Sequence, residues 1–508
     1  MFLKNPNLIL YVLLLSLFKV QAQDSLSLYP SIENQLDQLR VLNEEYYHNP
    51  ANMPDYGNTS FSDIGLHFQN FNKENYLMQE GRSQQQFRLE TASYKIRRDK
   101  SALWGSASYR QVKTRDVRWN NNIDLERVAP LVIADSVGGD QNLQNYHFKG
   151  GYAKTVRRFS FASELEYTAG LSYKTQDPRP KNTTSDLNFK AGLSYLLTDR
   201  YRIGFSAGLN KYLQSSQISF SSEIQRTPLY QMNGLGTYNF YFSNKTTAAY
   251  FNDFSHHYIF TLGTKDQSFS FTAGTLFGSL NKETPSPSGS NNAEINRIMR
   301  SSLFLHALKT IKLNDHYEIG AKLDFEKQEN KGYEILYTNN TSVLQKLLEK
   351  QNYHYTNNET RIHAILRHQS GKSNTTVTPY FSKRQTTEKK TDDAKLQDFE
   401  YHQWGINLFH MRQLSALDVL TLQAHAYKNK TKHAENLNIN SDKPGINEWL
   451  QHDQTIRTLD YNVIAASLRY DRKVQQKRSV YAIFALDYIT FSNNNNNIQT
   501  TLSLGVTF

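Results

Sequence analysis

Short segments in which apolar and polar residues alternate with period two recur along most of this sequence. Residues 317–326 are one example, and the pattern returns at 158–167, 186–196, 201–210 and 268–277. Side chains on an extended strand point alternately to opposite faces, so each segment predicts a strand with one apolar and one polar face. Such strands suit either a soluble sandwich or the wall of a transmembrane barrel.

The polar faces of these segments carry charges of both signs. Paired charges suit a water-filled lumen better than a soluble sheet, whose single core would have to be lined by all the opposite faces. The pattern therefore favours a barrel with an apolar exterior and a charged interior. The residues that we expect to line this lumen are Glu164, Glu166, Lys190, Arg202, Glu318, Lys322, Asp324 and Glu326.

The composition agrees with a membrane barrel. Aromatic residues make up 13% of the 508 residues, with 32 Tyr and 28 Phe, although the mean hydropathy is only −0.65. Beyond the N-terminal segment no run approaches the length of a membrane-spanning helix. Aromatic girdles explain the high aromatic content, and strands that meet lipid on just one face explain the low hydropathy. The chain has no cysteine, which excludes disulfide bonds, thiolate nucleophiles and a lipid-anchored N-terminal cysteine.

The N-terminus has the layout of a secretory signal. Lys4 precedes an apolar run at residues 8–18, and the small-residue exit Val20-Gln21-Ala22 follows. The run is too short for a membrane-spanning helix, so we predict cleavage after Ala22 and export from the cytoplasm. The predicted organisation is a signal peptide at 1–22, an N-terminal arm that is a candidate plug at 23–58, and an outer-membrane barrel at 59–508.

Short connections alternate with long polar ones between the predicted strands. Tight turns on the periplasmic side and longer loops outside are the expected layout of an outer-membrane barrel. The pattern predicts an all-β, transmembrane, antiparallel up-and-down barrel of about 18 strands, within a range of about 14 to 18, with both chain ends in the periplasm. The short connections are 97–101, 156–158, 198–200, 265–268, 314–316, 368–373, 412–416 and 474–479.

The last predicted strand alternates up to Phe508, with apolar residues from Ile498 to Phe508 on one face. A closed barrel has no free edge, so this strand must pair with the first one. The ending resembles the C-terminal signal that the barrel-insertion machinery reads in bacterial outer-membrane proteins. That resemblance implies that Phe508 is the insertion signal.

The predicted arm differs from the rest of the chain. Ile32, Leu36, Leu39 and Leu42 have the spacing of a short amphipathic helix, and Asn49-Pro50-Ala51 precedes the first predicted strand at residues 60–68. This order resembles the start of the long-chain fatty-acid transporter family and of the barrels that accompany type IX secretion. The resemblance implies an arm tucked inside or under the barrel. It does not extend to the substrate, and the chain as a whole resembles uncharacterised large barrels.

Two long loops contain apolar segments. Residues 130–134 form an apolar run that we expect to fold into the pore as a constriction, because such a run is poorly placed in water. Asp135 and Asp140 beside it supply too few oxygens for calcium. In the second loop, residues 343–350 have an apolar side typical of a short helix that docks on the barrel mouth or a partner. No metal ion or cofactor is expected, and no constellation of nucleophile, base and orienting group indicates an enzyme.

The net charge of +11 points to anionic partners. The basic residues are scattered and form no nucleic-acid recognition module, so lipopolysaccharide, outer-membrane lipid or anionic solutes are the expected partners. One predicted function is a channel or transporter for a small or hydrophobic solute. The alternative is an accessory barrel that partners a TonB-dependent transporter, a secretion system, a surface lipoprotein or another surface-protein complex. An outer-membrane hydrolase is a minor alternative.

Overall fold

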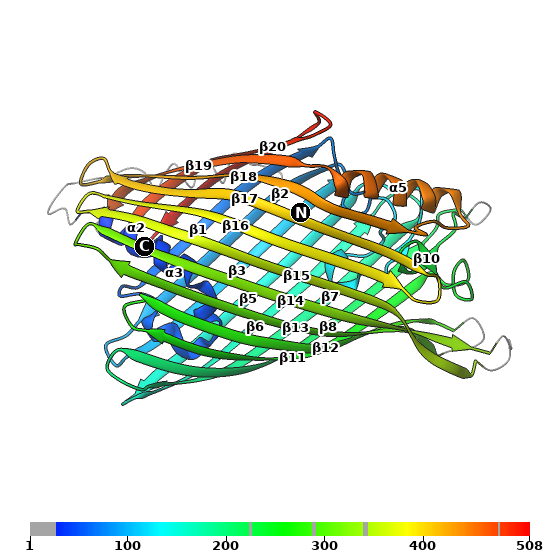
Figure 1. The fold of residues 1–508 in the computed structure, drawn as a ribbon, viewed down its shortest axis with the longest axis horizontal. Helices are drawn as coiled ribbons and strands as arrows, with labels where there is room; N and C mark the ends of the chain where they lie inside the picture. The colour runs from blue at the N-terminus through cyan, green and yellow to red at the C-terminus, as the bar shows by residue number, and fades with distance from the viewer. Residues whose placement is uncertain (1–26, 223–225, 287–290, 339–343, 476–477) are drawn as a thin grey trace.

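The computed structural model describes residues 27–222, 226–286, 291–338, 344–475 and 478–508. One antiparallel sheet of 18 strands forms the wall of the molecule (Figure 1). Its strands are β1 (Phe61–Lys73), β2 (Ser83–Ile96), β3 (Ser101–Arg115), β5 (Gln141–Val156), β6 (Phe159–Lys174), β7 (Arg179–Leu196), β8 (Tyr201–Ser219), β11 (Ala248–Thr264), β12 (Phe269–Pro285), β13 (Asn292–Lys312), β14 (Tyr317–Tyr337), β15 (Lys346–Ser370), β16 (Ser373–Lys390), β17 (Lys395–Gln413), β18 (Asp418–Leu437), β19 (Tyr461–Gln475), β20 (Arg478–Phe491) and β21 (Asn496–Thr507).

The sheet closes on itself. Each wall strand pairs with the next, and β21 returns to β1, with Asp63 opposite Thr507 and Lys73 opposite Asn497. The backbone of Phe508 continues this ladder through two hydrogen bonds with Ser62. The predicted fold class and the even number of strands are confirmed. The predicted pairing of the last strand with the first is also confirmed.

The two faces of the wall differ as the alternation predicts. On β14, Tyr317, Ile319 and Leu323 point outward and are 38–52% exposed, whereas Glu318 and Lys322 between them are buried. An apolar exterior around a charged interior, with every wall strand paired, is the architecture of an outer-membrane barrel. Among the described residues, no helix is long and apolar enough to cross a membrane.

The short connections lie at one end of the barrel, close to the predicted positions. At the other end the strands run further than predicted, and β13, β14 and β15 have 21, 21 and 25 residues. A transmembrane strand needs only about 9 to 11 residues, so the β14–β15 hairpin projects beyond the rest of the wall (Figure 1). The prediction of a helix at 343–350 is wrong for the part that the structure describes, residues 344–350. Residues 346–350 are strand, because they pair with the end of β14.

The N-terminal arm lies inside the barrel. It consists of α2 (Tyr29–Gln35), α3 (Gln38–Leu42) and two 3₁₀ turns, η1 (Glu44–His48) and η2 (Pro50–Asp55). Helix α2 contacts β17 and β18, η1 contacts β11 and β12, and η2 contacts β3 and β5 to β8, so the arm spans the barrel from wall to wall. Hydrogen bonds to the turns at Gln267 and Ala416 place it at the end with short connections. The predicted signal peptide falls outside the described residues.

Loops fill the opposite end of the barrel. They contain α4 (Leu125–Val128), a small sheet of β4 (Ile133–Ala134), β9 (Tyr230–Gly234) and β10 (Thr237–Tyr238), and helix α5 (Pro444–Thr458). Apolar residues of these loops pack on the inner face of β8 and β11 to β13. We call this group, which includes Trp119, Val132, Met232 and Trp449, the outer cluster. The predicted folding of residues 130–134 into the pore is confirmed.

Candidate functional site

The Asn49-Pro50-Ala51 motif docks the arm onto the wall. Asn49 is fully buried, its Oδ1 accepts a hydrogen bond from the backbone N–H of Ala51 at 3.0 Å, and its Nδ2 donates to Leu193 O and Thr261 Oγ1 at 3.4 Å. The carboxamide thereby caps η2 and ties it to β7 and β11. The motif that sequence analysis singled out is therefore a contact between arm and wall.

Two glycines of the wall make room for Asn49. A Cβ at Gly204 would lie 2.5 Å from Asn49 Nδ2, and a Cβ at Gly192 would overlap Asn49 Oδ1. Ser194 lies on the same patch of wall and donates a hydrogen bond to Ala51 O at 3.1 Å. The wall is thus shaped to receive the motif.

Three acidic side chains of the arm form ion pairs with predicted or neighbouring lumen residues. Asp55 Oδ2 lies 2.9 Å from Arg202 Nε, and Glu45 Oε1 lies 2.8 Å from Lys322 Nζ. Burial raises the pKa of the Asp55 carboxyl, while the Arg202 guanidinium acts in the opposite direction. The third pair, Asp37 with Arg367, is looser at 3.5 Å.

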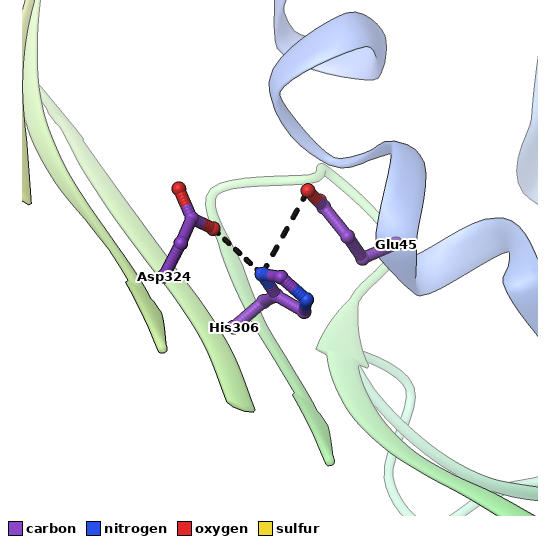
Figure 2. Close-up of side chains that lie close together, drawn as sticks. All are labelled: Glu45, His306 and Asp324. Atoms are coloured by element: carbon purple, nitrogen blue, oxygen red, sulfur yellow. Dashed lines mark hydrogen bonds and ion pairs between the residues drawn. The ribbon is translucent and has the colours of Figure 1, made fainter. Parts of the chain in front are cut away.

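Figure 2 shows the most crowded of these contacts, where η1 meets β13 and β14. His306 Nδ1 lies 2.7 Å from Asp324 Oδ1 and 3.8 Å from Glu45 Oε1. One ligand atom from each of these three residues lies within 4.8 Å of the others, a spacing that a metal ion could bridge. However, Lys322 Nζ lies 3.3 Å from Asp324 Oδ1 and also pairs with Glu45. The lysine supplies the cation between the carboxylates, so the group acts as an ion-paired tether.

Three of the other predicted lumen residues, Glu164, Glu166 and Lys190, also have partners in ion pairs. Glu164 pairs with Lys149 and Lys190 and accepts a hydrogen bond from Trp104 Nε1 at 2.7 Å. Glu166 pairs with His147 at 2.8 Å.

Closer to the arm, Glu318 pairs with Arg367 at 3.3 Å. Glu326 lines a cavity together with Glu45 and His48. That these residues line a solute path stays a prediction.

Beside the outer cluster, inside the barrel, lies a chamber of about 1100 Å³. Its wall comprises inner faces of β14 to β21 and the end of β1. Helix α5, the loop after β1 and residues 129–132 border it on the outer side. Tyr401, Tyr427 and Tyr461 point into it, together with Arg384 and Arg457. We call this space the aromatic chamber. Sequence analysis missed it, because the tyrosines were assigned to the lipid-facing girdles.

The sequence does hold a signal for this chamber. Trp404 and Ile406 on β17 are outward and exposed, so Tyr401 and Gln403, at odd positions, belong to the inner face. Tracing this parity along each strand separates inward tyrosines from girdle tyrosines. The register between strands, which brings these tyrosines together, cannot be read from one strand alone.

Comparisons with solved structures find other large barrels at low similarity. They include the ferric enterobactin receptor PfeA of Pseudomonas aeruginosa (10% identity, TM-score 0.38, covering 89% of this chain and 82% of that one) and the copper transporter OprC (8%, 0.42, 88% and 80%). The ferric preacinetobactin receptor BauA of Acinetobacter baumannii is similar to the same degree (8%, 0.41, 88% and 80%). Similarity at this level does not extend to function.

Comparison with curated proteins gives no match. The resemblance of the arm to the long-chain fatty-acid transporter family is not supported, because the family model that matches residues 50–508 is a different one. That model spans the whole barrel wall and the end of the arm. The chain therefore belongs to the family of unknown function DUF6850.

Proposed function

We propose that this protein is a bacterial outer-membrane transporter for a small solute, with a lumen closed at rest by the arm at the periplasmic end and by the outer cluster at the other. The aromatic chamber carries the proposal. A space of about 1100 Å³ between two closures is large enough for a small-molecule ligand and is lined by polar and aromatic side chains.

The arm is suited to be a gate because the barrel does not need it. The sheet is closed by β1 and β21, and the arm adds no strand to it. The ion pairs, the Asn49 site and small apolar clusters such as Leu28, Tyr29 and Ile32 against Phe409 hold the arm in place. These contacts can be broken without opening the ladder of the wall.

The test is planar-bilayer conductance of four proteins: the full chain, a chain without residues 27–58, a chain with residues 117–139 replaced by a Gly-Ser turn, and a chain with both changes. We expect conductance to rise when the arm is removed and to rise further when both closures are removed. Boiled and unboiled samples on a gel verify that each barrel is folded. A folded barrel that stays closed after both changes contradicts the proposal.

One observation favours the alternative of an accessory barrel. The projecting β14–β15 hairpin exposes Leu347 and Leu348, which are 66% and 50% accessible, outside the barrel wall. Such side chains suit a contact with a TonB-dependent transporter or a surface lipoprotein. If a partner copurifies with the full chain and is lost when both leucines are changed to serine, while the lumen stays closed in all four proteins above, the accessory function is favoured.

A further inference from the structure

A row of aromatic side chains crosses the inner wall of the barrel. Tyr427 of β18 lies beside Tyr461 of β19, with ring centroids 6.1 Å apart, and Tyr461 lies 5.5 Å from Phe491 of β20. Tyr380 of β16 extends the row across Gly405 of β17, where a Cβ would lie 2.5 Å from the tyrosine ring. The row thus spans five neighbouring strands.

These rings have no role in anchoring the barrel in lipid. Girdle aromatics face the membrane interfaces, whereas Tyr427, Tyr461 and Phe491 border the aromatic chamber. The chamber-facing side of the row is not covered by the outer cluster, whose wall contacts are on β8 and β11 to β13. Aromatic faces directed at an aqueous space are available to a ligand.

Positive charge without an ion-pair partner lies beside the row. Arg384 is exposed to the chamber, and its Nε donates to Asn357 Oδ1 at 3.1 Å. Within the described part of the chain, no carboxylate lies within ion-pair distance of Arg384 or of Arg457. Arg361, in contrast, pairs with Glu359 at 2.6 Å.

Several acidic residues of the chamber are already engaged. Glu80 pairs with Lys73, and Asp453 accepts hydrogen bonds from Trp449 Nε1 and from the backbone N–H of Met78. Glu388 and Glu126 also line the chamber, and Glu126 lies on α4, whose Arg127 pairs with Asp253 of β11 on the opposite wall. Beside the aromatic row, the charge that remains to receive a ligand is that of the Arg384 guanidinium.

Sugar rings match this combination of groups. Their C–H faces stack on aromatic rings, amides such as Gln403 and Asn429 bond their hydroxyls, and a free guanidinium binds a carboxylate or sulfate in bidentate fashion. The rings of the row are inclined at 72° and 44° to their neighbours, so each offers its own face to a successive unit and they form no parallel slot for one flat molecule. The chamber is also larger than most small-molecule sites, which favours several linked rings.

We propose that the aromatic chamber binds an acidic oligosaccharide, that is, linked sugar rings that carry carboxylate or sulfate groups. This proposal rests on the proposed function, because we take the oligosaccharide to be the transported solute. Binding itself requires no transport, so it is tested separately.

The experiment is calorimetric titration of the full-length, detergent-solubilised protein with tetragalacturonate and a heparin tetrasaccharide, which separate carboxylate from sulfate recognition. Maltotetraose is the neutral saccharide, and 2-naphthalenesulfonate is the flat aromatic anion. We expect at least one acidic tetrasaccharide to bind at least tenfold more tightly than maltotetraose. Arg384→Ala should weaken that binding at least tenfold, and Tyr427→Ala should weaken it as well.

Arg412→Ala is the matched control, because Arg412 is exposed on the outer face of β17. Arg384→Lys keeps the charge and should retain part of the affinity, and every variant must show the gel shift of a folded barrel. If maltotetraose binds as tightly as the acidic tetrasaccharides, the chamber has no specificity for acidic sugars and that part of the proposal is overturned. Preference for the naphthalenesulfonate overturns the proposal. So does the absence of saccharide binding both by the full chain and by the folded chain in which residues 117–139 are replaced, because the outer closure is then removed. A closed pore in the conductance test bears only on transport.

Discussion

Substitution of Gly204 by alanine tests whether the Asn49 site holds the arm inside the barrel. The new Cβ would lie 2.5 Å from Asn49 Nδ2 and 2.6 Å from Thr261 Oγ1, so the carboxamide has to leave its site. Loss of the cap on η2 costs about 1 kcal/mol, and loss of the partners of a buried amide costs about 2 kcal/mol more. Since 1.4 kcal/mol corresponds to a factor of ten, the population of undocked arm should rise about 150-fold.

The absence of cysteine from the chain provides the assay. Met53 is buried in η2, and Met53→Cys introduces a smaller thiol that a maleimide reaches only when the arm is undocked. The labelling rate in the folded barrel then reports the undocked population. We expect Gly204→Ala to accelerate labelling about 150-fold, in line with the rise in undocked arm. Gly150→Ala on β5, where nothing lies within 4 Å of the new Cβ, should leave the rate unchanged.

A double-mutant cycle gives the result that would refute this reasoning. Asn49→Gly removes the side chain that Gly204→Ala displaces, so the two changes together should accelerate labelling little more than Asn49→Gly alone. If Gly204→Ala does not change the labelling rate while the barrel stays folded, the Asn49 site does not hold the arm. Fully additive effects would mean that the new Cβ acts elsewhere in the wall.

Three further outcomes are expected. Lys322→Met leaves Glu45 and Asp324 without the cation between them, and labelling of the arm cysteine should rise about tenfold, an effect of about 1.4 kcal/mol that shrinks at high salt. Trp449→Ala removes the stack on Trp119 and should destabilise the outer cluster by about 3 kcal/mol, which appears as more frequent channel openings in the chain without the arm. The purified protein should migrate faster unboiled than boiled, and a protein that shows no shift and is released from membranes by carbonate is not a transmembrane barrel.

The fold was predictable because the signal for a barrel wall is local. Each strand carries its own period-two pattern, and the pattern on β14 already separates Tyr317 and Ile319 from Glu318 and Lys322. Strand ends were less predictable. Residues 346–350, for example, have the pattern of a short amphipathic helix in isolation and become strand through pairing with β14.

The sites were predictable only in part, because they depend on contacts between distant segments. The sequence marks Asn49-Pro50-Ala51 as a motif, but nothing near it indicates that Gly192, Gly204 and Thr261 receive it. These residues meet only when the barrel has closed and the arm has folded into it. The aromatic chamber has the same origin, since its rings come from strands whose relative register the turns and the closed sheet determine.

The two halves of the inner wall have different chemistry, and this difference bears on what the tyrosines do. The outer cluster lies on β8 and β11 to β13, where the wall contributes Phe251, Leu280 and Ile298. If the inward tyrosines of β18 and β19 served to pack a plug, the loops would cover them in the same way. Instead the apolar side chains of the loops pack on the opposite wall, α5 borders the chamber, and an open space remains in front of Tyr427 and Tyr461. Large aromatic faces left in contact with an aqueous space lose the free energy that burial would provide, which is the expected cost of a surface kept ready for a ligand.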